Sequence, residues 1–393
     1  MRRNTILNQL MQLLHNKGFW QIVNKYDGDR YCKKLSCSQE LAILIFALIK
    51  DLVSFRDIST GLKAHMDKWV HIGIQTVARS TLSEALARRP YKIYEELFYR
   101  FLERCHQYAP GHSFRVKVPV FTQDATLVSL CLSAYPWARY RRRKGALKLH
   151  MLFDHAGALP SFVRMTSGKV HEVRVVKDSS YDFPALPPDS ILTVDRGYMD
   201  YAWLYSLNQQ GITFIIRAKS NMAYRVVGQH GEVRKERGIL ADELIEFTNF
   251  YEQEAYPQPL RLIRYTYTDT KGNTHEIEVL TNNMKLAATT IAGLYKGRWE
   301  IEEFFRWIKQ NLKIKTFYGT SENAVMTQVW IALIVYLLLS FIKHQTRYGY
   351  SMLELLRIIR ERLLGFESLL ELLRVNYERL KKRLSFAEQL AFY

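Results

Sequence analysis

The segment LYKGRWEIEEFFRWIKQNL, residues 294–312, carries four polar side chains of different chemistry at helical spacing. Counting about 100° per residue from Tyr295 puts Arg298 at about 300°. Glu302 falls at about 340° and Lys309 at about 320° on the same helix. A phenol, a guanidinium, a carboxylate and an ammonium group therefore share one narrow face. Five apolar residues fill the neighbouring sector and predict a buried flank: Ile301, Phe304, Phe305, Ile308 and Leu312.

This set of side chains suits a phosphodiester substrate. A carboxylate binds Mg²⁺, Arg and Lys contact phosphate oxygens, and Tyr donates a hydrogen bond or stacks. The spacing also permits a simpler interpretation, because Arg298 and Glu302 form an i,i+4 pair of the kind found on many solvated helices. From spacing alone, a salt-bridged surface stripe and a phosphodiester site both stay open.

Two aspartates are the expected partners of Glu302, because a single carboxylate rarely holds Mg²⁺ in a useful geometry. Asp124 follows the expected strand VPVF, and Asp195 follows the expected strand SILTV. Carboxylates at the carboxyl ends of sheet strands face the crevice where α/β proteins bind their ligands. The three together predict a site for two divalent ions, in which one activates the attacking oxygen and the other stabilises the leaving oxygen.

A basic segment, RYRRRKGALKLH, lies beside the strand of the first aspartate. A basic run with an interleaved tyrosine suits contacts to the DNA backbone, although a solvated hairpin turn is a fair alternative. The candidate contacts are Arg139, Arg141, Arg142, Arg143 and Lys144.

Together these motifs resemble the DDE transposases of the fourth insertion-sequence family. The hallmark of that family is Tyr, two residues, Arg, three residues, Glu, six residues, Lys, which Tyr295 to Lys309 match in full. The first family aspartate sits in a turn like QDATLVSL, and the second in a segment like TVDRGYMDY. The segment RRRKGALKLH resembles a further family motif. The resemblance covers residues 115–340 well and the N-terminal helices more loosely.

The resemblance implies an RNase H-like core and metal-dependent nicking of DNA at the ends of a mobile element. The freed 3′ hydroxyl then attacks target DNA. Asp124, Asp195 and Glu302 would hold Mg²⁺ or Mn²⁺, and Arg298 and Lys309 would hold phosphates. Related enzymes release the element through a DNA hairpin with aromatic residues on a flipped base, for which Tyr295 and Trp299 are the candidates. The partners would be terminal-repeat and target DNA, bound by a homodimer.

The pattern along the chain predicts a mixed α/β sheet between two helical regions. Residues 1–112 read as helices, with Ser38 as a plausible N-cap and with Arg79, Arg88 and Arg89 on a candidate DNA-reading unit. Three expected strands and a strand–helix–strand crossover follow within 113–221, and 284–345 completes the core with one long helix from Ala287 to Leu312. Residues 222–283 read as a β-rich insertion and 346–393 as a C-terminal helical, dimerising region.

Composition narrows the class of protein. The 393 residues carry a formal net charge of +18, which indicates a polyanionic partner, either nucleic acid or an anionic membrane surface. Four cysteines form no zinc pattern and fit a reducing compartment. Polar residues interrupt the apolar N-terminus, so we do not expect export. The resemblance implies a cytoplasmic, nucleoid-associated bacterial protein. The apolar run Val329–Ile342 is shorter than the roughly 20 residues of a spanning helix, which favours a buried core helix.

Three other functions stay open at this point. The first is an inactive DNA-binding descendant of a transposase, and the second is an RNase H-like nuclease that never joins strands. The third is a basic membrane-surface protein that uses residues 329–342. Phosphate-cradling GxxxxGK, GxGxxG and HExxH motifs are absent from the sequence, so nucleotide-driven and zinc-protease chemistry have no support.

Overall fold

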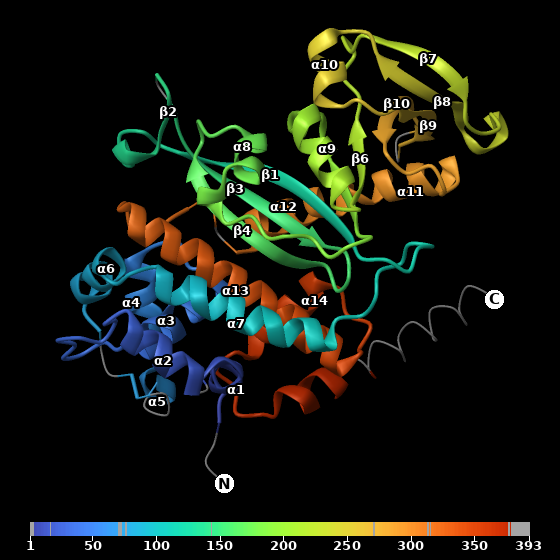
Figure 1. Ribbon diagram of the computed structural model, residues 1–393. Coiled ribbons are helices and arrows are strands. Elements are labelled where there is room, and N and C mark those ends of the chain that lie inside the picture. Colours follow the sequence, from blue (N-terminus) through green and yellow to red (C-terminus); the bar gives the residue numbers. More distant parts are fainter. Residues whose placement is uncertain are drawn as a thin grey trace.

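The computed structural model describes residues 4–15, 17–69, 73–74, 77–142, 144–269, 272–312, 314, 316–375 and 378. Helices form the N-terminal part, a mixed sheet the middle, and helices again the C-terminal part (Figure 1). This order confirms the mixed α/β class expected from the sequence. Much of the predicted C-terminal helical region, residues 376–377 and 379–393, lies outside the described residues.

The N-terminal helices start at caps that the sequence pattern places only approximately. Helix α3 begins after Ser36, whose side chain and that of Gln39 form a capping box, so the expectation of Ser38 as the cap was wrong. Helix α6 begins at Arg79 without a side-chain cap. The helices are α1 Ile6–Leu14, α2 Lys17–Lys25, α3 Cys37–Ile49, α4 Phe55–Ala64, α5 Met66–Trp69, α6 Arg79–Arg88 and α7 Lys92–Tyr108.

Within the described residues the strands form one ten-stranded sheet in the order β2-β3-β1-β5-β6-β10-β9-β8-β7, with β4 also paired to β3. Strand β1 is antiparallel to β3 and parallel to β5, and β5 is parallel to β6. Helix α9, Tyr201–Gln209, makes the crossover from β5 to β6, as predicted. The first strands are β1 Val120–Leu130, β2 Arg139–Arg141, β3 Lys144–Asp154, β4 Leu159–Ser167, β5 Ile191–Val194 and β6 Thr213–Arg217.

The β-rich segment extends the same sheet instead of forming a separate one. Strand β10 pairs antiparallel with β6, and β9, β8 and β7 follow outward from it. Alternating polar and apolar residues produce the β9–β10 hairpin, as expected for strands with one buried face. The elements are β7 Tyr224–Gln229, β8 Ile239–Phe247, α10 Phe250–Ala255, β9 Leu260–Thr268 and β10 Thr274–Thr281. They form the lobe at the upper right of Figure 1.

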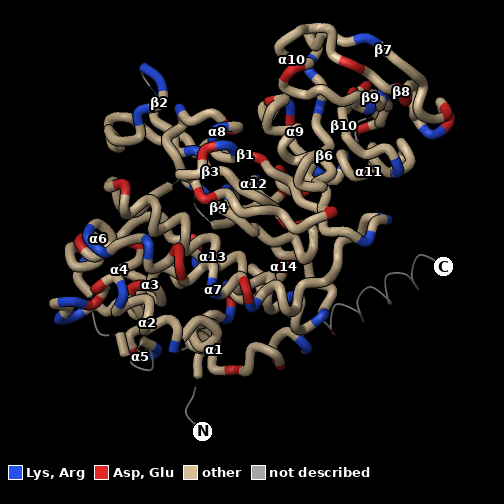
Figure 2. Tube along the Cα trace, in the orientation of Figure 1, with Lys and Arg blue, Asp and Glu red and all other residues tan. Residues whose placement is uncertain are grey.

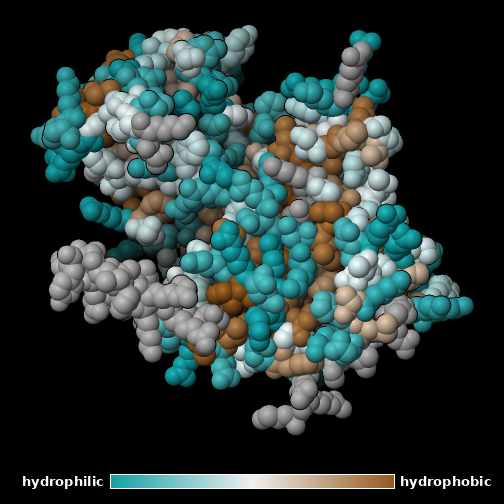
Figure 3. Space-filling view, turned by 180° about the vertical axis from the view of Figure 1, so that it is seen from behind, coloured by the Kyte–Doolittle hydropathy of each residue, from teal (hydrophilic) through white to brown (hydrophobic). Residues whose placement is uncertain are grey.

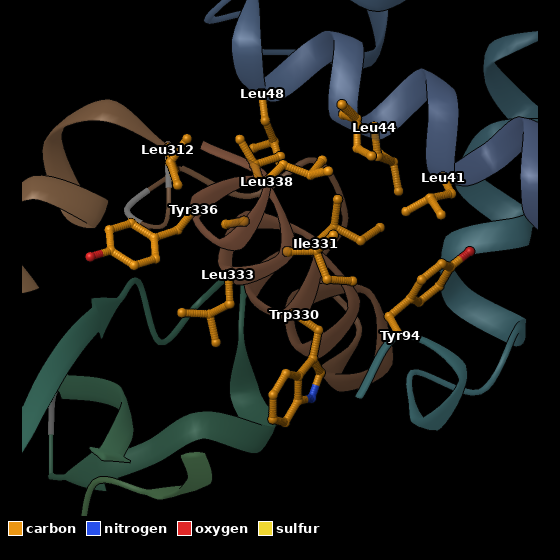
Figure 4. Close-up of a cluster of buried hydrophobic side chains, with 14 of the residues drawn as sticks. Leu41, Leu44, Leu48, Tyr94, Leu312, Trp330, Ile331, Leu333, Tyr336 and Leu338 are labelled. Atoms are coloured by element: carbon orange, nitrogen blue, oxygen red, sulfur yellow. The ribbon is translucent and has the colours of Figure 1, made fainter. Parts of the chain in front are cut away.

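Helix α13, Glu322–Thr346, lies at the centre of the largest core. It packs against α3 and α7 on one side and against β4 on the other, and Figure 4 shows Trp330, Ile331 and Leu333 at its surface. At 25 residues it has the length and composition to cross a membrane, yet the whole apolar window is buried inside the protein. The prediction of a core helix is thus confirmed, although the helix is longer than the apolar run Val329–Ile342.

The remaining helices are α8 Glu172–Lys177, α11 Ala288–Gly297, α12 Trp299–Asn311 and α14 Met352–Arg362. Helices α11 and α12 replace the single helix expected from Ala287 to Leu312, because the chain leaves regular helix hydrogen bonding at Arg298. The backbone of Arg298 keeps helical dihedrals, φ −52° and ψ −28°. The break is therefore local, and the apolar flank of α12 is buried as predicted.

Candidate active site

The two aspartates lie on neighbouring parallel strands. The parallel register of β1 and β5 ends with Gln123 opposite Val194, so Asp124 and Asp195 are the next residues along each strand. Strand β1 continues to Leu130, which puts Asp124 inside the strand, whereas the sequence predicted that it follows the strand. The longer antiparallel ladder with β3 keeps β1 extended beyond the point where β5 ends. Asp195 directly follows β5, as predicted.

Arg298 joins the first aspartate to the glutamate. Its Nη1 lies 3.2 Å from Oδ2 of Asp124, and its Nη2 lies 2.8 Å from Oε1 of Glu302. The Arg298 side chain is 9% exposed, so these are mostly desolvated, charge-assisted contacts. The i,i+4 pair seen in the sequence is present, but the same guanidinium also binds a strand 174 residues away in sequence. A purely solvated surface stripe is therefore excluded.

Negative charge exceeds positive charge at this place. The carboxylate of Asp195 makes no hydrogen bond or ion pair with any residue that the structure describes, and Nε of Arg298 is buried without a partner there. The pKa of Asp124 is raised to about 6, chiefly by burial and to a smaller extent by the nearby carboxylates of Glu302 and Asp195, while Arg298 and the backbone N–H of Ala125 oppose the rise. Three carboxylates against one guanidinium leave two excess negative charges when all are ionised.

Two aromatic rings lie near the Arg298 guanidinium. Its central carbon is 5.7 Å from the ring centre of Tyr295 and 5.8 Å from that of Trp299, both within cation–π range. Tyr295, on α11, is buried, its hydroxyl has no described partner, and burial raises its pKa to about 12. Trp299 is 45% exposed at the start of α12. The first ring supports the arginine from inside, and the second is open to a ligand.

Lys309 fastens the far end of α12 to the strand of the first aspartate. Its Nζ lies 2.5 Å from Oγ1 of Thr126 and 2.9 Å from the carbonyl oxygen of Leu127. Thr126 is two residues beyond Asp124, so both side chains lie on the same face of β1. Arg298 and Lys309, two residues of the Tyr-Arg-Glu-Lys spacing, therefore bind the same stretch of β1.

The basic segment forms the hairpin of β2 and the start of β3, at the opposite end of β1 from β5. Leu130 pairs with Gly145 there, about 20 Å along the strand from Asp124. Figure 2 shows the basic residues at the tip of this hairpin. Arg139, Arg141, Arg142 and Lys144 are exposed, and none forms an ion pair with a residue that the structure describes. Arg143 lies outside the described residues.

The structure separates the three arginines proposed for DNA reading. Arg89 is buried, where it forms an ion pair with Glu40 and bonds to the Gly28 carbonyl, so it is a core residue. Arg79 instead borders a cavity of about 760 Å³ together with Arg56, at the starts of helices α6 and α4. Arg88 is exposed. The pattern of basic residues could not distinguish these environments, because Glu40 is distant in sequence.

Sequence reasoning also missed polar residues beneath the carboxylates. Thr122 on β1 and Thr193 in the otherwise apolar β5 lie two residues before the two aspartates, and His155 and Glu300 contact this layer. The alternation of polar residues along β1, on a face that is apolar at both ends, was the available signal.

The carboxylates of Asp124, Asp195 and Glu302 are suitable ligands for a divalent cation. The Arg298 guanidinium lies between two of them, Asp124 and Glu302. Carboxylate oxygens are the preferred ligands of Mg²⁺ and Mn²⁺. Within the part of the chain that the structure describes, no three acidic, histidine or cysteine side chains are grouped closely enough to share one ion. The guanidinium accounts for this, because it bonds to Asp124 and Glu302 and keeps them on either side of itself.

Comparison with known proteins identifies similar sequences. Residues 119–338 match the family described as Transposase DDE domain, and residues 2–75 match a domain of unknown function. The chain is 28% identical over 347 residues to the probable transposase for insertion sequence element IS5377 of Geobacillus stearothermophilus, with 88% of this chain and 87% of that protein covered. It is 31% identical over 262 residues to a protein of Sinorhizobium fredii that bears the name transposase y4zB, with coverage of 66% and 69%.

A solved structure is similar in fold. It is a piggyBac transposase in a synaptic complex with hairpin DNA, and the TM-score is 0.50 at 13% sequence identity. The match covers 96% of this chain and 84% of that chain. This likeness supports the RNase H-like arrangement of the sheet that the sequence led us to expect.

Proposed function

The chain belongs to the family of transposases with a DDE domain and is a DNA transposase. We propose that Asp124, Asp195 and Glu302 are its metal-binding catalytic residues. The supporting observation is that Asp124 and Asp195 follow paired residues of β1 and β5, while Arg298 links Asp124 to Glu302 on α12. Enzymes of this family use divalent metal ions. We propose Mg²⁺ or Mn²⁺, with two ions bound. Membership of the fourth insertion-sequence family stays a prediction.

The proposed reaction is hydrolysis at the ends of an insertion sequence followed by transfer of the freed 3′ hydroxyls into target DNA. When bound, the divalent ions favour deprotonation of the attacking oxygen and stabilise charge on the leaving oxygen. Arg298 turns from its two carboxylates to a phosphate, and its guanidinium matches phosphate geometry as well as it matches carboxylate geometry. Lys309 contributes a second positive charge beside the same strand. Trp299, being exposed next to Arg298, stacks on an unpaired base.

The proposed path of DNA follows β1 from the carboxylates to the β2–β3 hairpin. Lys309 lies between them, and the exposed cations Arg139, Arg141, Arg142 and Lys144 lie at the end. Seen from behind, the surface is hollowed between the lobe of the insertion and the lobe that carries β2 (Figure 3). The cavity bordered by Arg56 and Arg79 offers a further phosphate contact in the N-terminal helical region.

We retain the division of the chain as a proposal. Residues 1–112 would bind DNA, 113–221 with 284–345 would catalyse, 222–283 would be the insertion, and 346–393 would mediate dimerisation. Terminal repeats and target DNA are the proposed partners, and a bacterial nucleoid the proposed place of action. The buried state of α13 gives the membrane-surface alternative no support from that helix.

The direct experiment uses labelled duplexes taken from the DNA that flanks the coding sequence. Incubation with Mg²⁺ should give cuts at the element boundary, and EDTA or Asp124→Ala should abolish them. Tight binding without any cut would favour an inactive DNA-binding descendant. If the Asp124→Ala variant cut DNA at the wild-type rate, the assignment of Asp124 as a catalytic residue would be refuted.

A strand-transfer assay separates the transposase from a nuclease of the same fold. Pre-nicked ends mixed with supercoiled plasmid should give joint molecules in the presence of Mg²⁺. Nicks without joint molecules would show a nuclease, and hairpin-ended intermediates would distinguish the route of excision.

A further inference from the structure

A chain of buried hydrogen bonds lies directly beneath the carboxylates. Oγ1 of Thr122 is 2.6 Å from Oγ1 of Thr193 and 2.8 Å from Nε2 of His155. Nδ1 of His155 is in turn 2.9 Å from Oε2 of Glu300. The chain thus runs from β5 through β1 and the end of β3 to α12. It connects the three elements that carry Asp195, Asp124 and Glu302.

Each connected residue has a fixed relation to a carboxylate. Thr122 precedes Asp124 by two positions and Thr193 precedes Asp195 by two, so each pair shares one face of its strand. Thr122 and Thr193 are also direct partners in the parallel register of β1 and β5. Glu300 lies on α12, two residues before Glu302. A shift of any one element would therefore break this chain and displace a carboxylate at the same time.

Because these side chains are buried, the loss of any of their hydrogen bonds destabilises the folded protein. Thr122 and Thr193 are 0% exposed, and the side chain of His155 is 1% exposed. On the same face of β1, Val120 belongs to one apolar cluster and Val128 to another, so the polar layer separates two parts of the core. Buried polar groups without partners destabilise the folded state, and the residues of this layer satisfy one another.

One set of donors and acceptors accounts for every contact in this chain of hydrogen bonds. The Thr193 hydroxyl donates to Oγ1 of Thr122 at 2.6 Å. The Thr122 hydroxyl donates to Nε2 of His155, and the proton on Nδ1 is donated to the Glu300 carboxylate. This arrangement leaves no donor opposed to another donor. It also fixes the ring of His155 from both sides.

We propose that His155 and Glu300 are positioning residues that hold α12 in register with β1 and β5 and so set the spacing of the three metal-binding carboxylates. The inference rests on the proposed function for the carboxylates and adds residues that the transposase motifs do not contain. Outer residues that orient metal ligands commonly contribute 10–100-fold in metal affinity. His155 does not touch DNA in this arrangement, because its ring is enclosed and both of its nitrogens are occupied.

The test measures metal binding without DNA. Glu300 is the best position to vary, because its side chain is 44% exposed and its loss leaves little cavity. In calorimetric titration with Mn²⁺, Glu300→Ala should bind about 10–100-fold more weakly than wild type. Glu300→Gln keeps an acceptor for Nδ1 and should recover most of the affinity. Glu303→Ala, an exposed glutamate on the same helix, is the matched control and should leave affinity unchanged.

Cleavage and folding give the accompanying readouts. Glu300→Ala should need a correspondingly higher Mg²⁺ concentration for half-maximal cutting, whereas DNA binding in EDTA should match wild type. Its thermal midpoint should fall by only a few degrees, because Nδ1 of His155 loses its hydrogen bond to Glu300. Thr122→Val should reproduce the defect and Thr122→Ser should not. Normal Mn²⁺ affinity in Glu300→Ala, together with lost affinity in Asp124→Ala, would overturn this inference alone. Normal affinity in Asp124→Ala would instead refute the carboxylate site.

Discussion

Two buried arginines in this protein have opposite surroundings. Arg261, on β9 of the insertion, donates to both carboxylate oxygens of Asp242 at 2.7 and 2.8 Å. Its remaining nitrogen donates to the carbonyl oxygens of Asn283 and Leu286 at 3.1 and 2.6 Å. One positive charge therefore meets one negative charge, and every nitrogen of the guanidinium has a partner. The group joins β8 and β9 to the segment that precedes α11.

Arg298 is buried to a similar degree but is incompletely satisfied. It is shared between Asp124 and Glu302, its Nε has no described partner, and Asp195 lies close by without one. Buried polar groups are normally paired, so an unpaired set on rigid elements marks a place prepared for a ligand. The comparison teaches that the balance of charge and partners, and not burial itself, distinguishes Arg261 from the arginine that we propose binds phosphate.

The largest expected effect is the loss of cleavage on neutralising a site carboxylate. Glu302→Gln should lower the cleavage rate by about 10⁴-fold or more, because transition-state stabilisation of several kcal/mol depends on the metal. DNA binding should persist, since the basic contacts remain. Single-turnover cleavage and a gel-shift titration measure both quantities. A cleavage rate equal to that of the wild type would show that Glu302, like Asp242, has no part in catalysis.

Removing each arginine should then separate structure from function. Arg261→Met leaves Asp242 buried and unpaired, which should cost about 3–5 kcal/mol in the free energy of unfolding whether or not metal is present. Arg298→Met should also destabilise the metal-free protein, through repulsion among the carboxylates, but Mg²⁺ should restore its stability. Urea denaturation with Mg²⁺ and with EDTA tests the contrast. If Mg²⁺ changed the stability of the two variants equally, the proposed difference between Arg261 and Arg298 would be refuted.

The pH dependence of stability should show the burial of the Asp124 carboxyl, to which the neighbouring carboxylates add. Because the pKa of Asp124 is raised from 3.8 to about 6 in the folded state, the folded protein binds this proton more tightly than the unfolded chain. Its contribution is present below pH 3.8 and is lost as pH rises through 6, an effect of at most about 3 kcal/mol.

Asp124→Asn keeps a neutral side chain at all pH values and provides the control. In EDTA, the thermal midpoint of the wild type should fall relative to that of Asp124→Asn between pH 4.5 and pH 7.5. Parallel curves for the two proteins would mean that folding does not raise the pKa of Asp124.

The smallest effect should come from the exposed cations of the β2–β3 hairpin, which have no described acidic partners. Replacing Arg141, Arg142 and Arg143 with Gln should weaken DNA binding about tenfold. The slope of log affinity against log salt should become shallower by about one for each phosphate that the variant no longer binds. Stability should hardly change, unlike that of Arg261→Met. Binding isotherms at several salt concentrations are the measurement, and an unchanged slope would remove the hairpin from the DNA surface.

The sequence by itself determined the features that depend on near neighbours. The Arg298–Glu302 pair, the buried flank of α12, the β5–α9–β6 crossover and the β9–β10 hairpin all follow from spacings of a few residues. The helical repeat and the alternation of strands fix such relations before any tertiary contact forms. The resemblance to known transposases, and not these local patterns, predicted the family and singled out the three carboxylates as a set.

Only the tertiary structure decided what lies beside each of these residues. It buried Arg89 against Glu40, placed Asp124 within β1, interrupted the predicted helix at Arg298 and turned that side chain toward Asp124. It also brought His155 next to Glu300, 145 residues away in sequence. Such contacts are formed by the closing of long loops around a shared core, and a local pattern contains no information about which distant group will complete them.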